Sequence, residues 1–296
     1  MDAVALAGVV QDCFPQLEIR NVSKLGEGWA SFVIEVNGEL VFRFPKRPDV
    51  EDNLRKEVQL VPRLARHLAT PVPRFDFVWR GGRQYEGWFV GYRKIEGVPI
   101  GRWCTRGSHS ARMASNLAAL LSAIHRFPYR RMKGLKLPVT GPAGRRRRMR
   151  SLYSRMEEEG FSLLTAKERK KAVDFFEEQI SNADNFRFSP TFIHDDLAAS
   201  HILCDRAMNR INGVIDWEDE SICDPAGDFY GIVQDCGVDY ARKVLEKYGG
   251  EPDPRMLQRA RLYVSLIPFY EVLYGREHDE ETLRFGLRRL RSTLLR

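Results

Sequence analysis

The sequence lacks the features that mark membrane proteins, secreted proteins and disulfide-stapled proteins. No apolar run approaches the roughly 20 residues that a membrane helix needs. No basic residues precede the first apolar stretch, as they would in a signal peptide. The five cysteines are odd in number and form no CxxC pair, so we expect reduced thiols and no zinc site. These absences predict a cytoplasmic protein that does not bind membranes.

The bulk composition is that of an ordinary soluble protein, with 43% hydrophobic and 29% charged residues. At 296 residues, the chain can form one large domain or two smaller ones around a cleft. The net charge of +7 is unevenly spread: residues 129–156 hold ten Lys or Arg and no acid, and residues 215–240 hold eight acids and no Lys or Arg. A basic run is usually a solvated face. The acids, however, are interleaved with apolar residues, so simple exposure explains them less well.

The first ninety-five residues predict mainly strands. "ASFVIEV" and "ELVFRFP" flank Asn37-Gly38, a strong hairpin signal because both turn positions need a positive φ. "DVEDNLRKEVQLVPRL" has helical apolar spacing, with Glu57 on the apolar stripe and Pro62 expected to kink or break the helix. Two further strands are expected on either side of Gly81-Gly82. The pattern therefore indicates a β-rich region with one helix.

The pattern changes after residue 95. "ARMASNLAALLSAIHRF" predicts an amphipathic helix, and residues 151–182 and 251–296 also predict helices. Residues 129–150 are basic and punctuated by Pro and Gly, so we expect a loop or insertion there. The prediction is an α+β fold with a small β-rich lobe (1–95), a larger, mainly helical lobe (96–296), and a basic loop and helical insertion at 129–182.

Polar residues gather in "TFIHDDLAASHILCD", which predicts a strand, a polar loop and a second strand. Asp196 in this loop can orient and deprotonate an attacking hydroxyl. His201 can ligate a metal or cap the loop. Asp216 follows the next apolar strand, where a magnesium-binding carboxylate or an ordinary turn aspartate would fit. Together these elements are the usual apparatus of phosphoryl transfer.

Phosphoryl transfer requires a nucleotide site in the first lobe. "KLGEGW" supplies Gly26 and Gly28 before a strand, although a pair of glycines alone is a weak signal. Arg43 lies inside a strand, and the inward-facing Glu57 is its expected partner. The order of glycine loop, strand cation, helix acid, catalytic loop and metal acid is hard to obtain by chance.

These motifs resemble the aminoglycoside phosphotransferase family, which has a bilobal protein-kinase-like fold. "HDDLAASH" is similar to the family's HxDxxxxN loop, and "VIDWEDESICDPAGDF" to its IDF/W…DPxxDF segment. "FRFPK", "KEVQLVPRLA" and "LLSAIHRFP" extend the resemblance over roughly residues 20–275. Two positions depart from the usual pattern. His201 replaces the Asn metal ligand, which resembles the 2″-O-phosphotransferase branch, and Arg43 replaces the strand lysine with a larger planar cation.

The resemblance implies a role for each matching residue. Asp196 is the expected catalytic carboxylate, and His201 and Asp216 are the expected Mg²⁺ ligands. His194 is expected to be structural, Asp195 to lie at the surface, and Asp228 to support the fold. The residues expected to bind ATP or GTP, with a hinge at residues 92–95, are Gly26, Gly28, Ser31, Arg43, Glu57, Tyr92, Arg93 and Ile95.

An aminoglycoside carries several ammonium groups, so its site should be rich in carboxylates. The expected substrate-binding residues are Asp219, Glu220, Asp224, Asp235, Asp239, Glu271 and Tyr274. The competing interpretation is that these acids cap helices and balance nearby arginines. We therefore expect a monomeric, Mg²⁺-dependent kinase that transfers the γ-phosphate of ATP or GTP to an aminoglycoside, at the 2″-hydroxyl, and confers resistance.

Two alternatives stay open. The apolar, aromatic segment "LYVSLIPFYEVLYG" favours a related kinase that acts on a macrolide, a sugar or another hydroxylated metabolite. The run "RRRRMR" would suit a non-catalytic module that binds nucleic acid or another anion. The intact Asp196 and Asp216 argue against that module, and we expect no nucleic-acid partner.

Overall fold

The computed structural model describes residues 2–27, 30–101, 109–131, 134–251 and 253–294. The chain forms two compact units, each built from two segments. The first unit comprises residues 1–136 and 199–220, and the second comprises residues 137–198 and 221–296. The predicted lobes of residues 1–95 and 96–296 stay a prediction.

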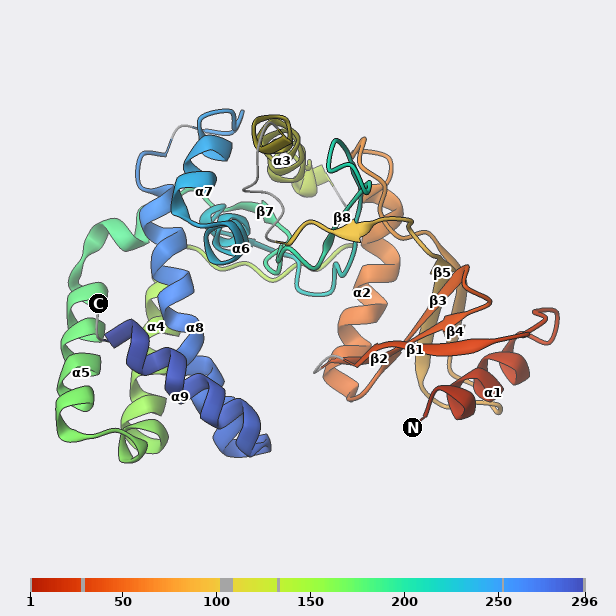
Figure 1. Ribbon diagram of the computed structural model, residues 1–296, viewed down its shortest axis with the longest axis horizontal. Coiled ribbons are helices and arrows are strands. Elements are labelled where there is room, and N and C mark those ends of the chain that lie inside the picture. Colours follow the sequence, from red (N-terminus) through yellow and green to blue (C-terminus); the bar gives the residue numbers. More distant parts are fainter. Residues whose placement is uncertain (1, 28–29, 102–108, 132–133, 252, 295–296) are drawn as a thin grey trace. The chain divides into compact units, whose positions relative to one another are not determined.

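The first unit contains a five-stranded antiparallel sheet (Figure 1). Its order is β1-β2-β3-β5-β4, with β1 at Val22–Glu27, β2 at Ser31–Val36, β3 at Leu40–Pro45, β4 at Phe75–Arg80 and β5 at Trp88–Arg93. Asn37 (φ 57°) and Gly38 (φ 71°) form the tight turn between β2 and β3. The predicted hairpin is confirmed: Val36 pairs with Leu40, and the short turn between them uses the positive φ angles that Asn and Gly allow.

Two helices pack on this sheet: α1 (Ala3–Cys13), which contacts β1 and β2, and α2 (Pro48–Leu64), which contacts β3 and β5. Phe42 and Phe44 of β3 share a buried cluster with α1. Since side chains alternate along a strand, Arg43 between them points to the opposite face. Of the predicted kink or break at Pro62, the break is wrong, because α2 continues to Leu64; the kink stays a prediction. Pro62 lies in the last turn, where the backbone bond from Ala65 to Val61 is kept.

The rest of the first unit carries the predicted amphipathic helix and a small sheet. The helix is α3 (His109–His125), and its apolar residues Leu117, Leu121 and Ile124 are buried. The small sheet has the order β6-β8-β9, with β6 at Val98–Pro99, β8 at Ile202–Cys204 and β9 at Ile211–Val214. A short 3₁₀ turn at Tyr129–Arg131 follows α3.

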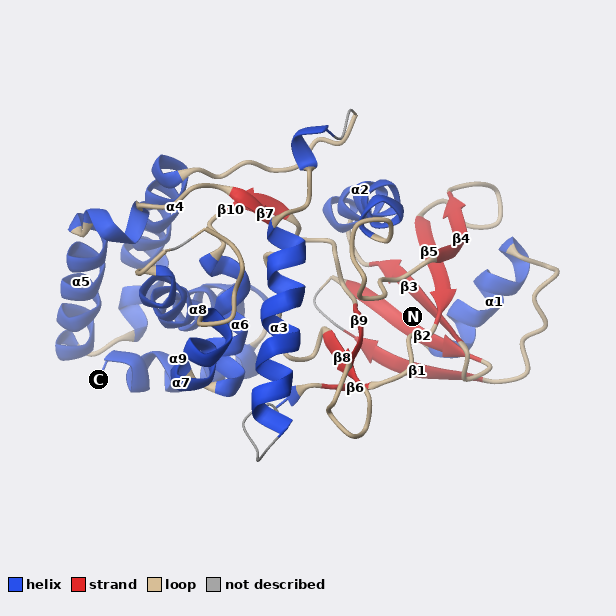
Figure 2. Ribbon diagram, turned by 90° about the horizontal axis from the view of Figure 1, so that it is seen from above, coloured by secondary structure: helices blue, strands red, loops and turns tan. Residues whose placement is uncertain are grey.

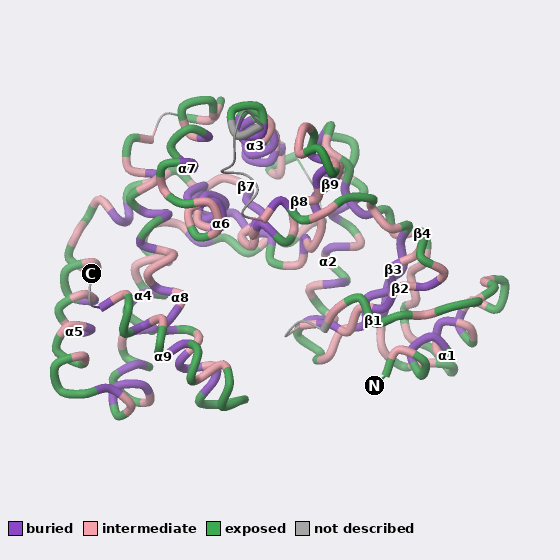
Figure 3. The backbone as a smooth tube through the Cα atoms, viewed as in Figure 1, coloured by how far each residue is buried: buried purple, intermediate pink, exposed green. Residues whose placement is uncertain are grey.

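The second unit is mainly helical. Its helices are α4 (Pro142–Arg155), α5 (Ala166–Ser181), α6 (Ala226–Cys236), α7 (Val238–Leu245), α8 (Met256–His278) and α9 (Glu280–Leu294). A π-helical turn (Met156–Gly160) and a 3₁₀ turn (Phe161–Leu163) join α4 to α5, and a second 3₁₀ turn (Ala183–Phe186) follows α5. Figure 3 shows buried residues where α8 and α9 pack together. Phe176, Phe269 and Leu290 lie in this core.

The basic run at 145–150 lies in α4, so of the loop or insertion predicted over 129–150, the loop is wrong from residue 142 onward. Pro142 at the first helical position suits a helix start, because its missing N–H needs no partner there. Met149 and Leu152 anchor the helix in the core. The charged head of Arg146 lies 4.6 Å from the ring centre of Phe186. Contacts of this kind allow an arginine-rich helix to pack.

Two predictions about the whole chain can be compared with the structure. Within the described ranges, no helix is long and apolar enough to cross a membrane. Cys13, Cys204 and Cys223 are free and buried, as predicted. Cys236, however, is disulfide-bonded, so the prediction of reduced thiols throughout is wrong. Spacing along the chain carries no information about cysteines that only the fold brings together.

Candidate active site

A buried ion pair joins the predicted strand cation to the predicted helix acid in the first unit. The Nη1 atom of Arg43 donates to both carboxylate oxygens of Glu57, at 3.0 and 3.1 Å. The side chain of Arg43 is 6% exposed and that of Glu57 is fully buried. Burial raises the pKa of Glu57, while the Arg43 charge opposes that rise. The predicted pairing of Arg43 with Glu57 is confirmed.

Two further carboxylates share the other end of the same guanidinium. The Nη2 atom of Arg43 lies 2.7 Å from Glu218 and 3.0 Å from Asp216. Burial alone would lower the pKa of Arg43, but the three carboxylates together raise it well above its usual value. The backbone N–H of Trp217 donates to Glu57 at 3.3 Å and ties this segment to α2. Arg43 is therefore a fixed, permanently charged group.

Glu218 was missed by the sequence reasoning. Burial raises its pKa to about 8, with Arg43 opposing the rise. Strand alternation gave no signal for it, because β9 ends at Val214 and Asp216 has a left-handed φ.

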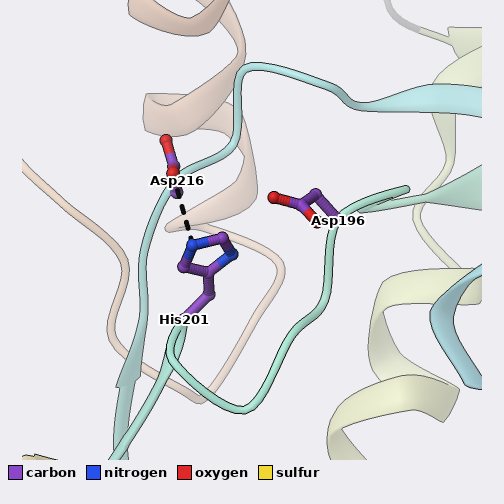
Figure 4. Close-up of side chains that lie close together, drawn as sticks. All are labelled: Asp196, His201 and Asp216. Carbon is purple, nitrogen blue, oxygen red and sulfur yellow. Dashed lines mark ion pairs between the residues drawn. The ribbon is translucent and has the colours of Figure 1, made fainter. Parts of the chain in front are cut away.

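His201 and Asp216 lie together at the ends of neighbouring strands (Figure 4). The Nε2 atom of His201 is 3.4 Å from a carboxylate oxygen of Asp216. The backbone carbonyl of His201 accepts a hydrogen bond from Ile215, which places the two side chains next to each other. Asp216 has a φ of 67°, in the left-handed region that aspartate tolerates better than most residues.

The donor set of this pair fits a divalent cation. One carboxylate oxygen of Asp216 contacts Arg43, and the other faces the His201 nitrogen. Mg²⁺ sites in nucleotide enzymes commonly use one or two carboxylates and complete the shell with phosphates and water. Neutral imidazole is also a metal ligand, although Mg²⁺ prefers oxygen. Asp216 and His201 can therefore hold Mg²⁺ between them.

The loop that carries Asp196 is anchored inside the second unit. Its strand β7 (Thr191–Ile193) pairs with β10 (Ser221–Cys223), as Figure 2 shows. The Asp228 carboxylate accepts the backbone N–H groups of His194 at 3.0 Å and Asp195 at 2.9 Å. A Cβ added at Gly231 would lie 2.2 Å from the carbonyl oxygen of Leu197, so only glycine lets α6 approach the loop this closely. The predicted supporting role of Asp228 is confirmed.

Asp196 is held by two neighbours in the second unit. The Tyr230 hydroxyl donates to its carboxylate at 2.8 Å. Its backbone N–H donates to Nδ1 of His194, which is fully buried, at 3.3 Å. Burial, followed by the Asp196 charge, raises the pKa of Tyr230, so the phenol stays a donor. His194 has the predicted structural contact, whereas Tyr230 was missed because sequence spacing does not show which side of α6 meets the loop.

Asp195 was expected at the surface, and that prediction is wrong. Its side chain is 20% exposed, accepts a hydrogen bond from Ser221 at 2.9 Å and lies 4.0 Å from Arg145. A φ of 64° turns the residue inward. Burial raises the pKa of Asp195 to about 6, with Arg145 opposing the rise.

The glycine loop predicted to approach the nucleotide is described in part. Gly26 lies in β1 beside an irregularity in its pairing with β2. Ser31 is buried at the start of β2. Gly28 lies outside the described residues. The nucleotide role of this loop stays a prediction.

The predicted hinge, residues 92–95, begins in the last two residues of β5. Tyr92 is buried, and burial raises its pKa. Arg93 is exposed and lies 3.7 Å from Glu39, and Ile95 is half-buried. The nucleotide-binding role of these residues stays a prediction.

The acids predicted to bind a polycation are divided between the two units. Asp219 and Glu220 belong to the first unit, and burial raises the pKa of Glu220 to about 9. The others belong to the second unit. Three of them form ion pairs there: Asp224 with Arg259, Asp239 with Arg242 and Glu271 with Arg289. Tyr274 stacks on His278, and Asp235 is half-buried in α6. Asp224 is fully buried and cannot reach a substrate, so its predicted substrate contact is wrong. The competing interpretation, acids balanced by arginines, fits these three pairs.

The sequence of residues 21–263 matches the model of the phosphotransferase enzyme family. The chain belongs to this family. The predicted family resemblance and the kinase-like fold are both confirmed.

Solved structures similar to this phosphotransferase cover almost all of it. It is 28% identical to aminoglycoside 2′-phosphotransferase-IIIa in a GDP complex, with a TM-score of 0.90 over 100% of this chain and 99% of that one. It is 27% identical to the GDP and kanamycin complex of APH(2″)-IIIa, with a TM-score of 0.89 over 98% of both chains.

A curated relative matches over a shorter region. Viomycin phosphotransferase of Streptomyces vinaceus is 32% identical over 98 residues, which are 32% of this phosphotransferase. The match therefore spans about a third of that relative, 34% of its length.

Proposed function

We propose that this phosphotransferase transfers the γ-phosphate of ATP or GTP to a hydroxyl group of an acceptor, with Mg²⁺ bound by Asp216 and His201. The observation that carries the proposal is the buried Arg43, held by Glu57 and placed beside Asp216. A buried cation next to a metal-binding carboxylate is the arrangement that kinases use to bind nucleotide phosphates.

In this reaction the acceptor oxygen bonds to the γ-phosphorus, and the bond from that phosphorus to the bridging oxygen breaks. The nucleoside diphosphate leaves, and the acceptor proton passes to Asp196. The hydrogen bond from Tyr230 fixes one oxygen of Asp196, so the carboxylate is oriented before the acceptor arrives. Arg43 offsets phosphate charge, and Mg²⁺ would neutralise the charge that develops on the phosphate oxygens. Catalysis here is positioning and electrostatics.

For the acceptor we propose an aminoglycoside, phosphorylated at the 2″-hydroxyl, so that the enzyme confers resistance. The support is the similarity, over nearly the whole chain, to an APH(2″) enzyme in complex with kanamycin and GDP. We also propose that the enzyme acts as a monomer in the cytoplasm, where nucleoside triphosphates are available.

Phosphate transfer by the purified protein tests the proposal. ATP and GTP would each be supplied with kanamycin, gentamicin, streptomycin or no acceptor, and Asp196→Ala would be the control. We expect acceptor-dependent transfer that falls about 10²–10⁴-fold in the variant, because that is what a positioned general base contributes. Activity in Asp196→Ala above about a tenth of wild type would overturn the assignment of the base. Tight nucleotide binding without transfer to any aminoglycoside would overturn the acceptor.

A further inference from the structure

A cavity of about 230 Å³ lies within the second unit, beside the groups that hold Asp196. Tyr230 lines it and also donates to the Asp196 carboxylate at 2.8 Å. Asp195, the neighbour of Asp196 in the chain, lines it as well. Asp196 itself does not line the cavity, so a molecule there would lie against Tyr230, the residue whose hydroxyl holds the proposed catalytic base.

The charged lining of the cavity is predominantly basic. Arg145 and Arg148, one turn apart on α4, both line it, and Asp195 is the single acid. Arg145 lies 4.3 Å from the ring centre of Tyr263 and 4.0 Å from Asp195. Its Nε atom is buried and has no hydrogen-bond partner among the described residues. The wall thus carries two cations against one carboxylate.

Arg148 is the second cation among the lining residues. It is exposed, and none of the described residues forms an ion pair with it. An ammonium group entering here would meet two guanidinium groups, and like charges brought together in a partly desolvated site repel. A carboxylate would instead find donors arranged in the fork that suits it.

The remaining lining is aromatic and apolar. Tyr230, Tyr263 and Tyr270 contribute rings, and Phe186 and Leu266 are among the apolar residues. Rings of this kind bind flat or ring-shaped ligands through their faces. The volume is below the roughly 300–1,000 Å³ of sites that enclose a drug-sized molecule. The cavity therefore suits one or two rings rather than a whole multi-ring polycation.

We propose that this cavity binds a ring-bearing alcohol that carries an acidic group, a second acceptor class for the phosphotransferase beside aminoglycosides. The inference rests on the proposed function, since the hydroxyl of the bound ring must reach Asp196 and take the γ-phosphate. The transfer is the same as for any acceptor: the hydroxyl oxygen bonds to phosphorus, its proton goes to Asp196, and the nucleoside diphosphate leaves.

Two aryl glycosides provide a matched pair of probes. 4-Nitrophenyl β-D-glucuronide and 4-nitrophenyl β-D-glucoside share their rings and differ at C6, where one has a carboxylate and the other a hydroxymethyl group. Their dissociation constants would be measured by titration calorimetry with the full-length Asp196→Asn protein, so that turnover does not interfere. We expect the glucuronide to bind more tightly at low ionic strength, by up to about fivefold, which is the upper limit for a partly exposed ion pair.

Two charge reversals on α4 test whether the preference for the glucuronide comes from the cavity or from the net positive charge of the protein. Arg148→Glu should abolish the preference for the glucuronide. Arg150→Glu, at an exposed position of α4 that does not line the cavity, should leave it in place. Both positions are exposed, so both variants should fold.

Equal affinities for the two glycosides, or a preference that survives Arg148→Glu, would overturn the inference. Transfer from ATP or GTP by the wild-type protein then separates the two proposals. Phosphorylation of kanamycin together with equal glycoside affinities would leave the proposed function standing and remove only the second acceptor class. A glucuronide preference in binding without transfer to any acceptor would overturn the acceptor role and the proposed function alike.

Discussion

Two partly or fully buried arginines, one in each unit, have opposite electrostatic surroundings. Arg43 in the first unit contacts three carboxylates, those of Glu57, Asp216 and Glu218. Arg145 in the second unit has one acid, Asp195, at 4.0 Å, and a tyrosine ring. The first guanidinium is therefore surrounded by excess negative charge, and the second is incompletely neutralised. The same residue type is a fixed part of an ion network in one place and an available ligand for anions in the other.

The largest effect should come from removing the guanidinium of Arg43. Arg43→Met would leave three carboxylates gathered around an apolar side chain. Removing one partner of a buried pair costs about 3–5 kcal/mol, because the remaining charges stay desolvated and uncompensated. Urea unfolding followed by circular dichroism would measure the change in the free energy of unfolding.

Arg145→Met is the matched control for that measurement. It removes a hydrogen bond and a ring contact with Tyr263 and one longer ion pair, so we expect a loss of about 1–2 kcal/mol. If the two variants were equally destabilised, the contrast between the two arginines would be lost. Arg43→Lys should recover part of the stability, since it keeps the charge but loses the second arm of the fork.

A smaller effect is expected at Tyr230, which joins the cavity to the proposed base. Tyr230→Phe removes the hydroxyl that donates to Asp196 and keeps the ring. A hydrogen bond to a charged group contributes about 1.5–3 kcal/mol, so kcat should fall about tenfold to a hundredfold. Nucleotide affinity should stay unchanged, because Arg43 and Asp216 are untouched. A rise in KM for the acceptor at unchanged kcat would instead make Tyr230 a binding residue only.

The sequence predicted those parts of the site that follow from a regular repeat. Helical periodicity places Glu57 on an inward-facing apolar stripe, and the strand residue Arg43 was then its expected partner. The loop between β7 and β8 was also predictable, because a polar run between two short apolar strands has few other solutions. These predictions needed no knowledge of how distant segments meet.

The residues that were missed or misplaced depend on distant segments. Tyr230 reaches Asp196 only because Gly231 allows α6 to approach the loop. Asp195 turns inward and has a positive φ, and a polar run in the sequence does not indicate that backbone conformation. The arginine-rich run was expected in a loop, yet it forms a helix whose buried side, at Met149 and Leu152, is only two residues wide. In each case the position or conformation of the residues depends on tertiary packing, which local composition does not show.

The smallest effect tests the electrostatics around Asp195 by its pH dependence. Burial raises the pKa of Asp195 to about 6, above the value of roughly 3.9 for an unfolded chain. Between these values the folded state binds more protons than the unfolded state, so the free energy of unfolding falls as the pH rises from about 4 to about 6. The full shift corresponds to about 3 kcal/mol, and partial exposure reduces this to about 1–2 kcal/mol. The side chain of the Asp195→Asn variant cannot ionise, and asparagine tolerates the same positive φ. The variant should therefore match wild type near pH 4 and be more stable than wild type above pH 6. Urea unfolding at both pH values measures the difference. If Asp195→Asn were less stable than wild type at pH 7, the Asp195 charge would be stabilising, and the expected pH dependence would be wrong.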